Sequence, residues 1–487
     1  MVLETFDGRC QVEWKEGGGS TAFGQLPFFI EFLKIAELFE PWVNECPIAY
    51  RSPNAPLVRD LLGTLFLSIL AGHRRYAHTA SIRSDDVCPK LLGMTKVVSE
   101  DSLRRGLSHI DKTQSDGWLG HHLRRSYEPL LAEPWILDID TTVKLLYGHQ
   151  EGAVKGYNPT KPGRPSHSYH TYWIAHARLA LDVDVYPGNL TASKYTQPGL
   201  WKLIDSLPVL SRPYLVRGDC NFGNESMMME AEKRGQHYLF KLRQTQNVKV
   251  LTKRLFRDEA WLNVGQGWHA VEGTLELNGW SKTRRVVMMR RRVRNDIALV
   301  SKDKNLFLFA QTHEASLDGY EYAVLVTSCN EDLATLAQLY RDRADIENTF
   351  DELKNQWGWG GFMTQDLARC TMVAKTTALI YNWWSLFVRL AIPDKHAEAI
   401  TSRPLLLHGI GKLTHHQNQT KISIISTHAK SKKVQVIFTQ IKNFMHSIQH
   451  AEQLSWNDKW RRILSRIFIV ILKGKQLFTQ QLALAPP

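Results

Sequence analysis

The sequence predicts an α/β protein, because short apolar strands alternate with helix-like segments through its middle. Residues 134–142 form an apolar run interrupted by two acids, and residues 214–219 form another that ends on Asp219. A helix-like segment at 224–234 and a strand-like run at 237–242 follow. Such alternation is typical of a sheet that is covered by helices.

The remaining elements are expected on both sides of these segments. Apolar residues recur at helical spacing in 25–45 and 57–72, which predicts helices near the N-terminus. We further expect strands at 170–181 and 322–328, a helix at 198–207, and one long helix from about Glu331 to Gln356. Between 244 and 318, glycines separate Trp261, Trp268 and Trp280, and strand-like runs occur at 285–291 and 306–310. This segment is therefore predicted to be a β-rich insertion.

Composition and charge narrow the class of protein. The chain has 487 residues, of which 43% are hydrophobic and 22% charged, so a disordered protein is excluded. Its formal net charge is +13, which favours a polyanionic partner, nucleic acid before a membrane. The six cysteines are far apart and include no Cys-x-x-Cys pair, so neither a disulfide framework nor a zinc ribbon is expected. With no apparent signal peptide or membrane span, we expect a cytoplasmic protein.

Most of the net positive charge, +11 of +13, lies in the last 87 residues of the chain. Residues 401–487 contain thirteen Lys and Arg but only two acids, Glu452 and Asp458. A solvated tail would explain this, but Trp456, Trp460 and Phe468 indicate that part of the segment packs. A basic and partly folded segment favours a surface that contacts phosphates.

Two predicted helices near residue 100 resemble a helix-turn-helix. The first would span about Asp85–Leu92, Gly93 would turn the chain, and Ser99 would cap a second helix that carries Arg104 and Arg105. Arg104 and Arg105 are therefore candidate DNA-binding residues. Helix pairs of this kind are also common in ordinary bundles, and no base-reading signature is present.

Three carboxylates stand out because they interrupt or end apolar strands. Asp138 and Asp140 are two residues apart, on the same face of one strand, and Asp219 ends another. A carboxylate in such a place is costly to dehydrate unless it is paired or binds a cation. Strands also end on Asp for turns and caps, so each acid alone is weak evidence of a site.

A fourth acid lies on the long predicted helix. At 3.6 residues per turn, four polar side chains fall on one narrow stripe: Tyr340, Arg343, Glu347 and Lys354. A salt-bridge ladder, with Arg343 and Glu347 one turn apart, would explain the charges equally well.

Together these segments resemble a known family. The spacing Tyr340-x2-Arg343-x3-Glu347-x6-Lys354 resembles the Tyr-Arg-Glu-Lys signature of the DDE insertion-sequence transposases of the IS-four superfamily, and the surrounding residues are most similar to the IS-thirteen-eighty family. The segments 137–142 and 217–222 resemble its first two catalytic blocks. The resemblance covers about residues 56–407.

The resemblance implies a fold and a division into domains. It implies a ribonuclease-H-like catalytic core with a β-rich insertion, a helical N-terminal domain and a basic C-terminal segment. The expected boundaries are a helical DNA-binding domain at 1–115, the core at 116–243 and 321–390, the insertion at 244–320 and the basic region at 391–487.

The resemblance also implies an activity. Asp140, Asp219 and Glu347 would be the catalytic metal ligands, with Asp140 favoured over Asp138 because Thr follows it. The expected cofactor is Mg²⁺ as two ions, with Mn²⁺ as a substitute. Tyr340, Arg343 and Lys354 would contact DNA. The partners would be double-stranded DNA at transposon ends and targets and a second copy in a synaptic homodimer, and the location would be the bacterial nucleoid.

Two other functions remain open at this stage. One is a metal-dependent DNA nuclease of the same fold that does not transfer strands. The other is a domesticated DNA-binding protein without catalysis, against which the presence of all three acids argues.

Overall fold

The structure is a computed structural model, and it divides the chain into two compact units. The first unit comprises Met1–His122, Lys354–Met363 and Leu379–Pro487, and the second comprises Leu123–Leu353 and Thr364–Ala378. The described residues are 1–13, 19–50, 52–158, 161–258, 260–292, 319–416, 419–425, 429–451 and 454–477. The domain boundaries expected from the sequence remain predictions.

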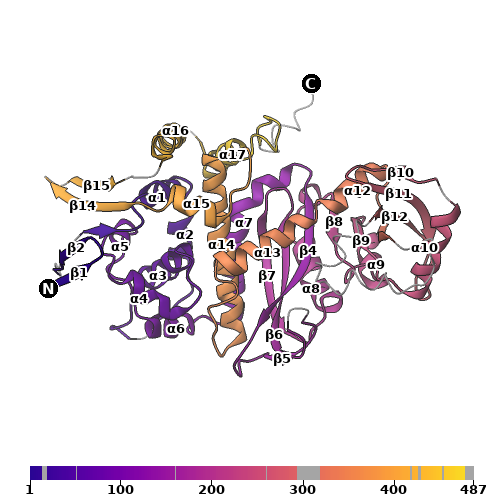
Figure 1. The fold of residues 1–487 in the computed structure, drawn as a ribbon, viewed down its shortest axis with the longest axis horizontal. Coiled ribbons are helices and arrows are strands. Elements are labelled where there is room, and N and C mark those ends of the chain that lie inside the picture. Colours follow the sequence, from indigo (N-terminus) through magenta and orange to yellow (C-terminus); the bar gives the residue numbers. More distant parts are fainter. Residues whose placement is uncertain are drawn as a thin grey trace. The chain divides into compact units, whose positions relative to one another are not determined.

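The second unit is a mixed α/β structure built on one large sheet (Figure 1). Its strand order is β10-β11-β12-β13-β9-β8-β4-β6-β5, and β7 pairs with β6. The strands β4, β8 and β9 run parallel, and the other neighbours are antiparallel. The central strands are β4 (Ile136–Leu145), β5 (Val154–Lys155), β6 (Pro165–Ile174), β7 (Leu179–Pro187), β8 (Leu215–Gly218) and β9 (His237–Lys241). The α/β class predicted from the sequence is thus confirmed.

The single strand predicted at 170–181 is wrong. The chain there forms the end of β6, a turn at 175–178 and the start of β7. The turn closes with a hydrogen bond from the Arg178 N–H to the Ala175 carbonyl, 3.2 Å, and Arg178 adopts φ 49°. Because this left-handed position is occupied by Arg rather than Gly or Asn, the sequence carries no turn signal there.

The predicted β-rich segment joins the same sheet instead of forming another one. Its described strands, together with the strand that follows, are β10 (Leu262–Asn263), β11 (Trp268–Leu275), β12 (Arg284–Arg292) and β13 (Tyr320–Thr327). Through β13, which pairs antiparallel with β9, they extend the sheet. The strand expected at 306–310 lies outside the described residues.

The long helix predicted at 331–356 is two helices. A turn at Asp342–Arg343 separates α12 (Leu333–Arg341) from α13 (Ala344–Gln356). Across this turn the Arg343 and Ile346 N–H groups bond carbonyls three residues back, at 3.2 and 3.1 Å, so the backbone tightens there. Leu336 and Ala337 of α12 are fully buried in the core of the sheet. The unit also contains α8 (Ala192–Asp205), α9 (Glu225–Lys233) and α10 (Gln246–Asp258).

The first unit is mainly helical. Its early helices are α1 (Leu26–Ile35), α2 (Phe39–Asn44), α3 (Val58–Leu70), α4 (Thr79–Ile82), α5 (Cys88–Leu91) and α6 (Glu100–Leu107). Residues of both units belong to α7 (Lys112–Tyr127) and α14 (Leu367–Ala391). The unit also contains α15 (Ala399–Leu406), the hairpin β1 (Val2–Thr5) and β2 (Gly8–Gln11), and a sheet of β3 (Ser20–Thr21), β14 (Ile410–His416) and β15 (Gln419–Ile425). Among the described residues, no helix is long and apolar enough to cross a bilayer.

The sequence predicted that part of the basic end of the chain packs, and in the structure it packs against α1. It forms α16 (Ser431–Gln449) and α17 (Trp456–Ile467). Phe438 of α16 stacks on Phe28 with ring centroids 3.9 Å apart, and the Trp456 indole N–H donates to the Ala36 carbonyl, 3.0 Å. Trp460 is fully buried. Apolar contacts of this kind make the segment part of the folded unit.

The first helix of the predicted helix-turn-helix is much shorter than expected. Asp85 accepts the N–H groups of Val87 and Cys88 at 2.9 Å, and Pro89 suits only a first helical turn, so α5 begins at Cys88 rather than at Asp85. Gly93 does turn the chain, with φ 67°. Ser99 caps α6 as predicted, because its hydroxyl accepts the Ser102 N–H.

Candidate active site

Asp140 and Asp219 lie on neighbouring parallel strands. In the register of β4 and β8, Asp138 is opposite Arg217 and Ile139 is opposite Gly218. The next residues along the two strands are Asp140 and Asp219, so the sheet brings these acids side by side although 78 residues separate them in the chain. Parallel strands deliver side chains to one edge of a sheet, which is where sites form in α/β proteins.

Burial makes Asp140 an unusual acid. It is 8% exposed. Burial raises its pKa to about 7, and the negative charge of Asp219 adds to this effect, whereas the Arg343 guanidinium opposes it. One oxygen accepts the Thr141 N–H at 2.7 Å, and the other accepts from Arg343 at 2.8 Å. A buried carboxyl with a raised pKa is a good candidate for binding a cation in place of its proton.

Arg343 links two of the candidate acids. Its Nη1 is 2.8 Å from Asp140 Oδ2, and its Nη2 is 3.4 Å from Glu347 Oε1. Glu347 lies on the first turn of α13 and its side chain is 69% exposed. Arg343 also lies over the Tyr340 ring, with 5.8 Å between Cζ and the centroid. Three members of the predicted stripe therefore meet, even though the helix is broken between Tyr340 and Glu347.

Tyr340 and Asp219 complete the surroundings of Arg343. Tyr340 is packed against the core of the sheet, and burial raises its pKa to about 12, so its hydroxyl keeps its proton at neutral pH. Asp219 is partly buried, and its oxygens accept from the main-chain and side-chain N–H groups of Asn221 at 2.9 and 3.0 Å. These bonds hold the Asp219 carboxylate in a fixed orientation.

Asp138 has a different environment from Asp140. It is 2% exposed and forms two contacts with the equally buried Arg217, Nε to Oδ1 at 2.5 Å and Nη2 to Oδ2 at 2.7 Å. Arg217 also donates to the Leu339 carbonyl. A buried carboxylate that is neutralised in this bidentate way is a structural partner of the arginine. This role of Arg217 was not predicted from the sequence, although a charge inside the apolar run 214–219 indicates that a partner must exist.

The other predicted DNA-binding residues lie in the first unit. Lys354 is near the end of α13, and its relation to the carboxylates stays a prediction. Arg104 pairs with Glu100 at 2.5 Å and lies over the Tyr76 ring. Arg105 is exposed, and its Nε donates to the Asp101 carbonyl at 3.3 Å. Both arginines therefore have partners within their own helix.

The donor atoms of the candidate site suit a hard divalent ion. Asp140, Asp219 and Glu347 offer only carboxylate oxygens, which Mg²⁺ and Mn²⁺ prefer. Within the described part of the chain, however, the one set of three acidic, His or Cys ligand atoms within 4.8 Å of one another is elsewhere, at Glu45, His121 and His122. At the candidate active site a guanidinium lies between two of the acids, so a cation already occupies the position between their charges.

The sequence also matches a known protein family. The family model described as "Transposase DDE domain" matches residues 131–383, a little over half of the chain. The chain therefore belongs to this family. It is a DDE-type transposase, an enzyme of DNA transposition, and such enzymes generally use divalent metal ions.

Two further comparisons add little. No curated protein matches the chain. Among solved structures, it is similar to one whose title reads "Cryo-EM structure of piggyBac transposase synaptic complex with hairpin DNA (SNHP)", at 12% identity and a TM-score of 0.37, over 92% of this chain and 88% of that one.

Proposed function

We propose that this transposase binds the terminal inverted repeats of an insertion sequence and catalyses metal-dependent DNA strand cleavage and strand transfer. The observation that carries the proposal is the placement of Asp140 and Asp219 at the same level of two parallel strands, with Glu347 joined to Asp140 through Arg343. We also propose that the protein belongs to the IS-four superfamily and, within it, to the IS-thirteen-eighty family.

The sheet order supports a ribonuclease-H-like core. Across the centre it is β7-β6-β4-β8-β9, so the strands counted from β4, without the short β5, lie in the order third, second, first, fourth and fifth. The first three are antiparallel and the last two run parallel to the first. In this core the first acid comes from the first strand, the second acid follows the fourth, and the third comes from a late helix. Asp140, Asp219 and Glu347 occupy these places.

Asp140, Asp219 and Glu347 would hold Mg²⁺, as two ions, or Mn²⁺. Bound divalent ions activate a water or a 3′-hydroxyl and stabilise the leaving oxygen of a phosphodiester. The surrounding residues have supporting tasks: Asn221 orients Asp219, and Thr141 orients Asp140. Arg343, Tyr340 and Lys354 would contact the phosphates beside the scissile bond.

The contact between Arg343 and Asp140 should also affect metal binding, because the guanidinium competes with a metal ion for this carboxylate. We expect Arg343→Gln to tighten Mn²⁺ binding to the DNA-free protein on the order of tenfold, because a positive charge beside the ion is removed, and at the same time to slow DNA cleavage. Free Mn²⁺ measured by electron paramagnetic resonance during a titration tests the first effect. Arg178→Gln is the matched control, because Arg178 pairs with exposed Asp345 at 2.9 Å. Equal Mn²⁺ affinity in wild type and Arg343→Gln would show that Arg343 does not compete.

The exposed basic side chains of α16 and α17 would contact DNA phosphates irrespective of sequence. The set comprises Lys432, Lys433, Lys442, Arg462 and Arg466, and the apolar side of α16 faces the core. Deleting the segment would uncover Phe28, so charge removal is the cleaner change. Replacing all five by Gln should lower the slope of log K against log salt by about 0.9 for each phosphate that the protein no longer neutralises. Fluorescence anisotropy of a labelled end duplex across a salt series measures this slope.

The control for that series is Lys202→Gln, which removes an exposed charge from α8. Its slope should match that of the wild type. If the variant with all five replacements folds normally and also keeps the wild-type slope, α16 and α17 do not contact phosphates.

One assay separates the proposed function from the two alternatives. The purified protein is incubated with a labelled transposon end, Mg²⁺ and a target plasmid. A transposase joins the cleaved end to the plasmid, whereas a nuclease of the same fold cuts the end without joining it. A domesticated DNA-binding protein retains the end uncut. Joined product is the result that the proposed function predicts.

A further inference from the structure

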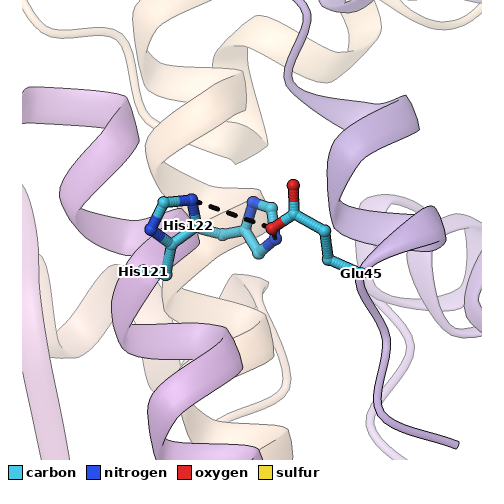
Figure 2. A group of neighbouring side chains, drawn as sticks. All are labelled: Glu45, His121 and His122. Atoms are coloured by element: carbon cyan, nitrogen blue, oxygen red, sulfur yellow. Dashed lines mark ion pairs between the residues drawn. The ribbon is translucent and has the colours of Figure 1, made fainter.

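Three potential metal ligands meet in the first unit, whereas the acids of the sheet belong to the second. Figure 2 shows the rings of His121 and His122, neighbours on α7, beside the carboxylate of Glu45, which directly follows α2. The Nε2 atom of His122 is 3.2 Å from Glu45 Oε2, and that of His121 is 3.7 Å from the same oxygen. All three ligand atoms lie within 4.8 Å of one another.

These distances suit a tetrahedral ion. Two ligands that are each bonded at about 2.0–2.1 Å to a tetrahedral ion lie roughly 3.3 Å apart. The two measured distances to Glu45 lie on either side of this value. The side chains of Glu45 and His121 are 51% and 58% exposed, so both have room to change rotamer around an ion. The side chain of His122, 1% exposed, is the fixed ligand.

The backbone that carries these ligands is held in place by two stacked tryptophans. Trp42 of α2 and Trp118 of α7 have centroids 5.7 Å apart and ring planes 6° apart, and the Trp118 indole N–H donates to the Trp42 carbonyl at 3.0 Å. Trp118 lies one helical turn before His122, on the same side of α7. The Glu45 N–H bonds the Pro41 carbonyl at 2.9 Å, which ties Glu45 to α2. The ligands therefore lie on elements whose separation is already set.

We propose that Glu45, His121 and His122 bind one Zn²⁺ ion, with water in the remaining position. Imidazole nitrogens favour zinc and similar transition ions over Mg²⁺, so this site differs in chemistry from the carboxylate site of the sheet. Binding would join the end of α2 to α7 and stabilise the first unit. The proposed zinc site does not depend on the proposed catalytic function. The alternative to a metal site is an ion pair between Glu45 and a protonated histidine.

Isothermal titration of the full-length protein with ZnCl₂, in excess Mg²⁺ to occupy the carboxylate site, tests the proposal. We expect one Zn²⁺ per chain, and a loss of affinity of at least 10- to 100-fold in His121→Gln and in Glu45→Gln, since even the loss of a group that only supports a ligand costs that much. Both residues are largely exposed, so neither change should unfold the protein. His149→Gln, in an exposed histidine of the second unit, should bind as the wild type does.

Thermal unfolding separates a metal site from an ion pair. Zn²⁺ should raise the Tm of the wild type at pH 7.5, and the rise should shrink in acid, because metal ligands must be deprotonated to bind. Glu45→Gln should show a smaller rise and His149→Gln the full one. The proposal is overturned if Zn²⁺ leaves the wild-type Tm unchanged, or if all variants bind Zn²⁺ equally.

Discussion

Asp140→Asn, Asp219→Asn and Glu347→Gln should each slow cleavage of a transposon end by about a thousandfold or more and leave binding of that end largely intact. Each change keeps the shape of the side chain but removes the negative charge that a divalent ion requires. Single-turnover cleavage of a labelled end, compared with anisotropy binding of the same duplex, measures both quantities. Asp345→Asn is the matched control, because Asp345 lies on the same turn of α13 and pairs with Arg178 instead. Full cleavage by Glu347→Gln would remove that residue from the site.

The pH dependence of Asp140→Asn is a second expected signature. Burial raises the pKa of Asp140 to about 7, so the folded metal-free protein holds this proton more tightly than the unfolded chain does. The resulting stability is lost as the pH rises through about 7. Without divalent ions, Asp140→Asn should therefore gain stability relative to the wild type above pH 7, where Asn avoids the cost of a buried charge. Urea unfolding at pH 6 and pH 8 measures the difference.

Asp138→Asn should instead damage the fold. Its replacement leaves Arg217 buried without its carboxylate, and breaking a buried pair in this way costs about 3–5 kcal/mol. We expect a large drop in the urea midpoint, with the cleavage rate of the remaining folded protein close to that of the wild type. The double variant Asp138→Leu/Arg217→Met removes both charges and should recover most of the stability.

The stability and the cleavage activity of Asp138→Asn also decide which acid, Asp138 or Asp140, binds the metal. If Asp138→Asn is as stable as the wild type and fails to cleave DNA, Asp138 and not Asp140 is the ligand. The contacts with Arg217, at 2.5 and 2.7 Å, make the opposite outcome the expected one.

The sequence predicted the central strands well, because their signals are local. β4, β8 and β9 are short apolar runs bounded by turn residues, and Ser99 marks the start of α6. The turn at Arg178 and the break at Asp342–Arg343 were missed for one reason: neither contains Gly or Pro. Local propensity carries no signal for the end of an element at either place.

The candidate site was predictable only in part. The spacing of Tyr340, Arg343 and Glu347 indicated that these side chains lie together, and the structure places them in contact. The contact of Arg343 with Asp140 depends on a turn that the sequence does not mark. The pairing of Asp138 with Arg217 depends on the register of two strands, and the cluster at Glu45 joins helices far apart in the chain. Such long-range contacts have no signature in a single sequence.

Locating the bound metal tests directly whether Asp140, Asp219 and Glu347 form the catalytic metal site. The purified protein is loaded with Fe²⁺ in place of Mg²⁺. Ascorbate and hydrogen peroxide then generate hydroxyl radicals that cut the chain close to the ion. Excess Zn²⁺ is added first, to fill any histidine site. We expect cuts near residues 140, 219 and 347 that excess Mg²⁺ suppresses and that Asp219→Asn abolishes. Cuts that avoid all three positions, or that persist unchanged in Asp219→Asn, would contradict the assignment of these acids as the catalytic metal site.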